Sequence, residues 1–404
     1  MKNKYIYILM ALSALFSCEI VDESGLDNKE EVEKVSMTFT ATIEDDAQSK
    51  TVLDGNVGDA LRKVLWEPGD CIGVIGTGMT ANSPQKFTLN ETSQTELGTF
   101  SGEIDFNKHY TAFYPYDAII QYYCNSSAVI GHDGFYFDLP MTQKYTPGSF
   151  DSSCAPMIAS APVGEPLQFK NICGLLSIQL TGTDVIKSIT FVGTDAYGSK
   201  MPVAGTYFTN WSESEVCTLA TVRTELLKYS VTLECDEAVA LDPDTPTPFY
   251  FLLPPATYPT FTLMITTVDG KIMFKQGTKP LTIKRSDAAY AKDFQYVENQ
   301  YIDLSDKGNA NCYIVPSAGL YSFDATVVGN GDYGYISSEP FYPQSSNLSP
   351  YSVVLLWEEV EGMVTGLTLE DGRVKFVHNG LKGNALVAVK DESEKIIWSW
   401  HLWM

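Results

Sequence analysis

The feature that most constrains this fold is the alternation of apolar and polar residues in short segments bounded by glycine and proline. The first such segment, residues 37–44, reads Met-Thr-Phe-Thr-Ala-Thr-Ile-Glu. One side of it carries Met37, Phe39, Ala41 and Ile43. A period of two indicates a half-buried strand. Similar segments recur along the chain and helical periodicity is nearly absent, so we expect an all-β protein.

Composition favours the same class. The 404 residues include 23 Tyr, 20 Phe, 30 Gly and 20 Pro, and charged residues make up only 19%. Aromatic residues favour strands, while glycine and proline favour the turns between them. The formal net charge of −23 argues against a nucleic-acid partner and favours solubility at a surface.

Five segments are expected along the chain. A signal peptide (1–17) and an acidic flexible tether (18–35) precede an N-terminal β-sandwich (36–163), a second β-sandwich (164–305) and a smaller C-terminal β domain (306–404). Long strands and short turns suggest that the two sandwiches are tandem Greek-key domains of transthyretin or immunoglobulin type. No second apolar run approaches the length of a membrane helix.

Turn residues punctuate these blocks at three clear points. Pro68-Gly69 suits a type II turn, because glycine supplies the positive φ that this turn requires. Asp269-Gly270 and Asp371-Gly372 are two-residue hairpin signals. The strongest apolar segment, 167–180, is expected to be one strand, with Gly174 marking a bulge or close packing.

The N-terminus has the pattern of a lipoprotein signal. Lys2 and Lys4 precede an apolar run that is too short to span a bilayer, and Ser17 comes directly before Cys18. We expect the Cys18 thiol to take a diacylglyceryl group, because two or three acyl chains anchor a protein firmly. The alternative is an ordinary secretory signal with a chance cysteine. Residues 19–34 carry seven acids against two lysines and are too polar to fold alone.

The other seven cysteines form no CxxC pair, so they make a poor zinc site and a poor disulfide framework. We expect buried free thiols, as for Cys71, which precedes Ile72, and Cys173, which follows Ile172, with one or two bridges as the alternative. Residues 54–59 have calcium-like spacing but lack the closing acid, so we interpret them as a solvated turn. No metal or cofactor is expected.

Catalytic motifs find little support. None of the four histidines lies in a HExxH pattern, and there is no GxSxG elbow. His401 is interpreted as a packed, satisfied imidazole. The glycines in residues 73–78 have a spacing similar to that of a phosphate-binding loop. No lysine or predicted helix follows them, so a hairpin turn is the better interpretation. We therefore expect a protein that is not an enzyme.

Several passages together resemble the fimbrillin family of Bacteroidetes type V pilin-like surface lipoproteins. These passages are the lipobox; the first strand leading to 49–51; 64–72; Tyr114-Pro-Tyr116; 167–182; and 249–254. The similarity covers about residues 36–300 and implies two sandwich domains. It also implies a structural or accessory, tip-type subunit of fimbriae with a role in adhesion, lipid-anchored in the outer membrane, exposed at the cell surface and present in fimbriae.

The resemblance further implies processing. In the family, a protease cuts behind the first strand and releases it, and another subunit's strand then fills the groove. The implied cut lies between Lys50 and Thr51, with Arg62 as a second choice; the usual arginine is a lysine here. Withdrawing the four apolar residues of the first strand would expose side chains worth roughly 1.5–3 kcal/mol for each large one. A donor strand would therefore bind firmly.

Two alternatives stay open. The apolar C-terminal strand is the obvious donor, with one face carrying Ile396, Trp398, Trp400 and Leu402. Completion of its own domain is the favoured alternative, because apolar termini usually pack within their own chain. The chain could also be a lipoprotein that never polymerises and binds a glycan or a host protein, since its many aromatic residues could line a glycan platform.

Overall fold

The computed structural model describes residues 34–44, 65–77, 84–123, 134–210, 226–277, 279–291, 293–329 and 347–404. Strands β1 to β30 make up nearly all of the regular structure in these ranges, which confirms the predicted all-β class. Two 3₁₀ turns interrupt them, η1 (Tyr116–Ala118) and η2 (Ser152–Cys154). Within the same ranges, no helix has the length and apolarity needed to cross a membrane.

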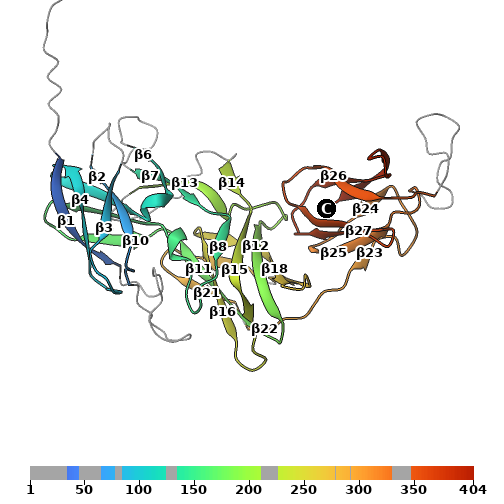
Figure 1. Cartoon of the computed structure of the whole chain (residues 1–404), viewed down its shortest axis with the longest axis horizontal. Coiled ribbons are helices and arrows are strands. Elements are labelled where there is room, and N and C mark those ends of the chain that lie inside the picture. Colours follow the sequence, from blue (N-terminus) through green and yellow to red (C-terminus); the bar gives the residue numbers. More distant parts are fainter. Residues whose placement is uncertain are drawn as a thin grey trace, which may run out of the picture. The chain divides into compact units, whose positions relative to one another are not determined.

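Seven strands of the first block close into a barrel in the order β1-β10-β9-β5-β2-β3-β4. Their bounds are β1 Lys34–Ile43, β2 Cys71–Gly76, β3 Gln85–Leu89, β4 Gly98–Asp105, β5 His109–Tyr114, β9 Met157–Pro162 and β10 Leu167–Asn171. β1, blue in Figure 1, pairs antiparallel with β4 and parallel with β10. We expected two separate layers, as in a sandwich. Instead, the seven strands of the first block form one closed sheet.

Trp66 lies at the centre of the barrel core. Its ring is fully buried and meets Phe100, Tyr114 and Phe169 edge to face, at centroid distances of 5.0, 5.5 and 5.4 Å. Its indole Nε1 donates a 3.1 Å hydrogen bond to the carbonyl of Ala41 in β1. Trp66 itself lies outside the named strands, because it forms only an isolated bridge with Thr95.

The second block contains two larger sheets that enclose a common core. One sheet has the order β16-β11-β21, with β22 also paired to β11, and the other has the order β19-β18-β12-β15-β8. Their bounds are β8 Thr142–Lys144, β11 Gly174–Thr181, β12 Val185–Thr194, β15 Ser230–Ala240, β16 Thr247–Leu253, β18 Thr260–Thr267, β19 Ile272–Gln276, β21 Ala288–Tyr290 and β22 Phe294–Gln295.

Two smaller sheets complete these blocks, in the orders β14-β13-β7-β6 and β17-β20. Their bounds are β6 Ile119–Tyr123, β7 Gly134–Leu139, β13 Ala204–Asn210, β14 Leu227–Lys228, β17 Ala256–Tyr258 and β20 Leu281–Ile283. β7 and β8 precede residue 163 yet pair with β13 and β15, while β10 follows it and pairs with β1. Sheets thus run across the expected domain boundary.

The segment 167–180 is two strands rather than the single one expected. β10 belongs to the barrel and β11 to the next sheet, and the buried residues Ile172 and Cys173 join them. Gly174 begins β11 where a side chain would clash, because a Cβ there would lie 2.1 Å from the carbonyl oxygen of Lys284. The expected close packing at this glycine is confirmed.

The third block is a sandwich of two four-stranded sheets, β23-β25-β28-β27 and β24-β30-β29-β26. Their bounds are β23 Ile302–Asp303, β24 Cys312–Ile314, β25 Gly319–Asp324, β26 Ser352–Glu358, β27 Val364–Glu370, β28 Arg373–His378, β29 Asn384–Lys390 and β30 Ile396–Trp403. When the eight strands are lettered A, A′ and B to G in chain order, the two sheets have the orders A-B-E-D and A′-G-F-C. These are the strand orders of an immunoglobulin-like sandwich.

The predicted turns are confirmed. Gly69 has a φ of +96° in the turn that the Asp70 amide closes onto the carbonyl of Glu67. Gly270 (φ +82°) joins β18 to β19. Asp371 and Gly372 both have positive φ between β27 and β28, as a type I′ turn requires.

Replacing Trp66 by alanine is expected to destabilise the barrel by about 3–5 kcal/mol, because it removes a buried aromatic side chain and the hydrogen bond to β1. Hydrogen exchange of the β1, β4 and β5 amides measures the effect. Trp403→Ala, which removes an exposed indole, serves as the control and should leave these amides unchanged. Equal protection in the two variants would contradict the central role of Trp66.

Candidate functional site

The first candidate site is the position that β1 occupies in the barrel. Phe39 and Ala41 are buried there, and Met37 and Ile43 pack against the same core while partly exposed. The Phe39 ring meets Phe87 and Tyr110 edge to face, at 5.2 and 5.1 Å. The face predicted from the alternation is therefore the face that points into the barrel.

A largely buried carboxylate holds the end of β1 in place. Glu44, whose side chain is 13% exposed, forms an ion pair with Arg285 and accepts a 2.8 Å hydrogen bond from the Asn171 amide. The Ser286 hydroxyl donates to the same carboxylate oxygen. We call these four residues the Glu44 cluster. Hydrogen bonds to a charged group are about twice as strong as neutral ones, so the cluster adds a polar attachment to the apolar one.

Ser286 takes an unusual backbone conformation within the Glu44 cluster. Its φ of +56° lies in the left-handed region, which costs a non-glycine residue free energy. Its hydroxyl reaches both Glu44 and the side-chain amide of Asn171. The conformation therefore places a donor on the carboxylate that ends β1.

Other predicted residues of this site lie outside the described ranges. These are the lipidation residue Cys18 and the processing residues Lys50, Thr51 and Arg62, together with the calcium-like segment 54–59. β1 ends at Ile43 and the next strand begins at Cys71, so both predicted cuts fall in the connection between them.

The predicted donor strand is β30, and in this structure both of its edges are paired. It pairs antiparallel with β29 and parallel with β24 in its own sheet. Trp400 and Leu402 are fully buried and Trp398 packs against the same core. Ile396 does not share their face, because a register shift between Val389 and Lys390 pairs it with Lys390 and leaves it exposed.

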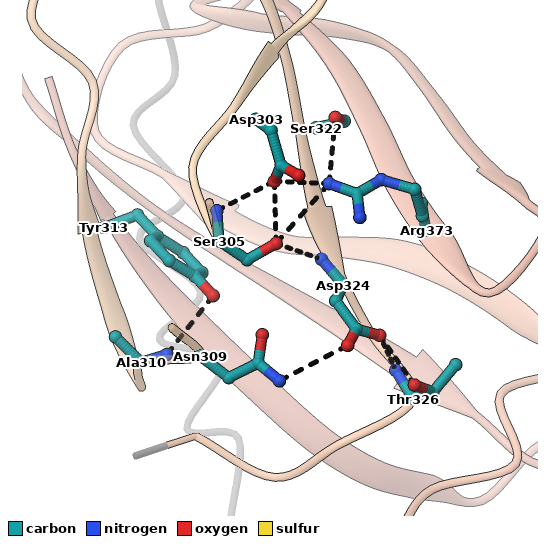
Figure 2. Close-up of polar contacts among 9 residues, drawn as sticks. All are labelled: Asp303, Ser305, Asn309, Ala310, Tyr313, Ser322, Asp324, Thr326 and Arg373. Atoms are coloured by element: carbon teal, nitrogen blue, oxygen red, sulfur yellow. Dashed lines mark hydrogen bonds and ion pairs between the residues drawn. The ribbon is translucent and has the colours of Figure 1, made fainter. Parts of the chain in front are cut away.

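The second candidate site is a polar network at the start of the third block (Figure 2). Arg373 of β28 forms an ion pair with Asp303 of β23 and donates to Ser322 at 3.3 Å. The Ser305 hydroxyl donates to Asp303 at 2.7 Å and accepts from the Asp324 amide at 2.9 Å. The network therefore ties the first strand of this sandwich to β25 and β28.

Hydrogen bonds also occupy the second carboxylate of the network. Asp324 accepts from the Thr326 amide and hydroxyl at 2.8 and 2.6 Å, and from Asn309 at 3.3 Å. These hydrogen bonds and the nearby Arg373 hold the pKa of Asp324 below its usual value, although burial opposes them. Because both carboxylates are already bonded within the chain, the network fits a structural role better than a catalytic one.

The histidines and cysteines that the structure describes do not converge on a reactive centre. Within the described ranges, no three His, Cys, Asp or Glu side chains are placed to hold a metal ion. Free thiols are found at Cys71, Cys154, Cys173, Cys235 and Cys312. Cys173 is buried as predicted, whereas Cys71 is only partly buried. Burial raises the pKa of the Cys235 thiol to about 11, which keeps it protonated and unreactive.

Each described histidine has a local partner. His401 is half-buried and accepts a 3.1 Å hydrogen bond from Trp403 Nε1, which confirms the satisfied imidazole. His378 is buried, and its Nδ1 lies 3.2 Å from the Met363 carbonyl. Burial lowers the pKa of His378 to about 4, because the charged ring would lose its hydration.

Comparisons with known proteins give structural likeness alone. No family model matches the chain, and no curated protein matches it. A candidate cell adhesion protein of Bacteroides uniformis is 14% identical, with a TM-score of 0.33 over 62% of this chain and 88% of that one. Another from Bacteroides fragilis is 10% identical, with a TM-score of 0.31 over 62% and 91%.

A candidate adhesin of Bacteroides ovatus is 8% identical, with a TM-score of 0.23 over 65% of this chain and 93% of that one. TM-scores below 0.5 are too low to transfer a function. The functional argument therefore rests on the residues of this chain.

Sequence reasoning missed the Glu44 cluster. Glu44 and Arg285 are 241 residues apart, and no local pattern marks the pair. It also gave no role to the outer-facing Trp403 beside His401, although alternation alone places the two on one face of β30.

Replacing Glu44 by alanine should destabilise the attachment of β1 by about 2–3 kcal/mol, because Arg285 loses its partner while mostly buried. The expected result is faster hydrogen exchange in β1 with unchanged exchange in β29 and β30. Glu103→Ala, on the exposed side of the neighbouring strand β4, is the matched control. The same exchange rate in both variants would show that the cluster does not hold β1.

Acid should weaken the third block through His378. The unfolded chain takes up a proton near pH 6.5, whereas the folded chain resists until about pH 4, so the free energy of unfolding falls as the pH drops between these values. The full loss is about 3 kcal/mol. Urea unfolding followed by tryptophan fluorescence at pH 7 and pH 4.5 measures it.

In this experiment His378→Gln should flatten the pH dependence of the free energy of unfolding. The glutamine amide can donate to the Met363 carbonyl but does not titrate. His401→Gln, in the same sandwich, should keep it. An unchanged slope in His378→Gln would rule out His378 as the source.

Proposed function

We propose that this chain is a surface lipoprotein of the outer membrane, held by acylated Cys18, that serves in adhesion as a structural or accessory subunit of fimbriae. One observation carries the proposal: β1, the first strand after the tether, closes the barrel between β4 and β10. Removal of any strand would open the closed barrel, and β1 is the barrel strand that precedes the predicted cuts in the chain.

Removal of β1 would leave two unpaired edges and an apolar trench. β4 would lose eight register partners and β10 would lose three, and the core around Phe39 would meet water. Unpaired edges of this kind are templates for strand addition from another chain. The trench would therefore favour occupation by a strand of a second subunit.

A cut after Lys50 or Arg62 would not by itself release β1. The strand would still be held by its ladders to β4 and β10 and by the Glu44 cluster. An incoming strand would have to replace these contacts. Release would therefore accompany assembly rather than precede it, which protects the trench from water.

A second role is favoured by the C-terminal strand. β30 is paired on both edges in its own sheet, so it would have to leave that sheet to serve as a donor. The second candidate function is a lipoprotein that never polymerises and binds its ligand through the third block.

Processing in cells separates the two roles. In the first role, sheared surface material should contain filaments whose copies of this chain begin at Thr51 or Lys63. The double variant Lys50→Ala, Arg62→Ala should retain residues 18–50 and form none of these filaments. N-terminal sequencing and immunogold microscopy provide the measurements. Lys86→Ala, which removes a basic residue away from the predicted cuts, is the control.

Cys18→Ala should remove acyl label and membrane retention in either role. A chain that keeps residues 18–50 in every fraction, with no filaments, would refute the first role and leave the second. Unchanged membrane retention of Cys18→Ala would refute the lipid anchor that both roles share.

A further inference from the structure

The outer face of the sheet β24-β30-β29-β26 carries aromatic residues that its fold does not require. Pairing places His401, Leu386 and Trp357 in one row across three strands. The neighbouring row contains Ile314 and Trp403 opposite each other, followed by Asn384. Directly opposed residues project from the same face of a sheet. We call these six residues the outer platform.

Large side chains of the outer platform remain in water. Ile314 is 77% exposed, Trp403 55% and Trp357 51%. A single exposed apolar side chain is ordinary, but several on one face mark an interaction surface. The opposite face of the same sheet already supplies the core through residues such as Trp400 and Val387. The exposed indoles therefore need another explanation.

A β-bulge in β26 places Trp357 on the outer platform. Val353 and Leu355 point towards the core, so strict alternation would turn Trp357 inward as well. The register shifts between Leu355 and Trp357, which leaves Leu356 as the extra residue and pairs Trp357 with Leu386. Bulges often re-aim a side chain beside a functional site.

Polar groups lie among the rings of the outer platform. The Asn384 side chain donates a 3.1 Å hydrogen bond to Glu359, and that pairing holds both groups on the same face. The His401 ring lies 5.2 Å from the Trp403 ring and accepts its Nε1–H. Flat aromatic surfaces thus alternate with fixed donors and acceptors.

We propose that the outer platform binds a neutral oligosaccharide. A pyranose ring has one face of C–H groups that packs on an indole, whose electron-rich face attracts their partial positive charge. Its hydroxyls are both donors and acceptors, and they match Asn384, Glu359 and His401. Adjacent strands lie ≈ 4.8 Å apart, so the indoles of β26 and β30 are separated by about two strand spacings, which several linked sugars would span.

Charge and size favour this ligand over other partners. Glu359 borders the platform, and the lysine at the far end of the same face, Lys390, is paired with Glu394 at 2.9 Å. Lys382 lines the hollow beside Ile314 and Trp403, but Glu359 and the chain's net charge of −23 disfavour anionic glycans, anionic lipids and nucleic acids. A stable protein interface uses about 20–30 residues on each side, many more than the platform offers.

The proposal deepens the binding role of the third block proposed above by naming its ligand class. It requires neither cleavage nor assembly of the chain. Its test on purified protein is therefore independent of the processing experiment.

The experiment uses the full chain, purified in detergent and titrated with cellohexaose, chitohexaose, xylohexaose and mannohexaose. At least one should bind saturably and change the tryptophan fluorescence. Trp357→Ala and Trp403→Ala should each raise the Kd about tenfold or more, and Asn384→Ala should raise it less. A chondroitin sulfate hexasaccharide should bind more weakly than the best neutral ligand.

Tyr197→Ala, which removes an 80% exposed aromatic residue in the second block, is the matched control and should leave the Kd unchanged. Circular dichroism checks that each variant is folded. Binding of none of the neutral probes, or equal losses in Tyr197→Ala, would overturn the proposal. So would a wild-type dimer that Trp357→Ala converts to a monomer in sedimentation, because the platform would then be a self-association face.

Discussion

Closure of the barrel by β1 is the constraint on which the first block depends. β1 is the only one of the seven barrel strands that comes before the connection 44–70, yet it supplies hydrogen bonds to two neighbours at once. Trp66 binds to its backbone, Phe39 fills the core behind it, and the Glu44 cluster holds its end. Apolar packing, backbone pairing and a partly buried ion pair therefore all hold the same strand.

In the third block, core packing and the outer surface depend on different residues of the same strands. In β30 and β29 one set of alternate side chains fills the core, and the other set faces outward. The polar network around Arg373 orders the start of this sandwich on its other sheet, at the opposite layer from the outer platform. Stability and surface chemistry are therefore assigned to different residues, so a change in one need not alter the other.

Local patterns predicted much of this architecture. Alternation placed Phe39 and Ala41 in the core, and the Asp-Gly pairs placed two hairpins, because both signals act between near neighbours. The pairing of β8 with β15 and the contact of Glu44 with Arg285 join residues far apart in the chain, and no local signal encodes them. Trp357 was hidden for another reason, since one inserted residue reverses the face that alternation assigns.

Because of the extra residue Leu356, the length of β26 determines which of its side chains face solvent. With Leu356 present, an indole stands in solvent; without it, the same indole would turn inward and a neighbouring side chain would take its place outside. The order of the strands in the sheet would stay the same. Related chains could thus diverge in what they recognise through a single-codon insertion or loss, while their sandwich is inherited intact.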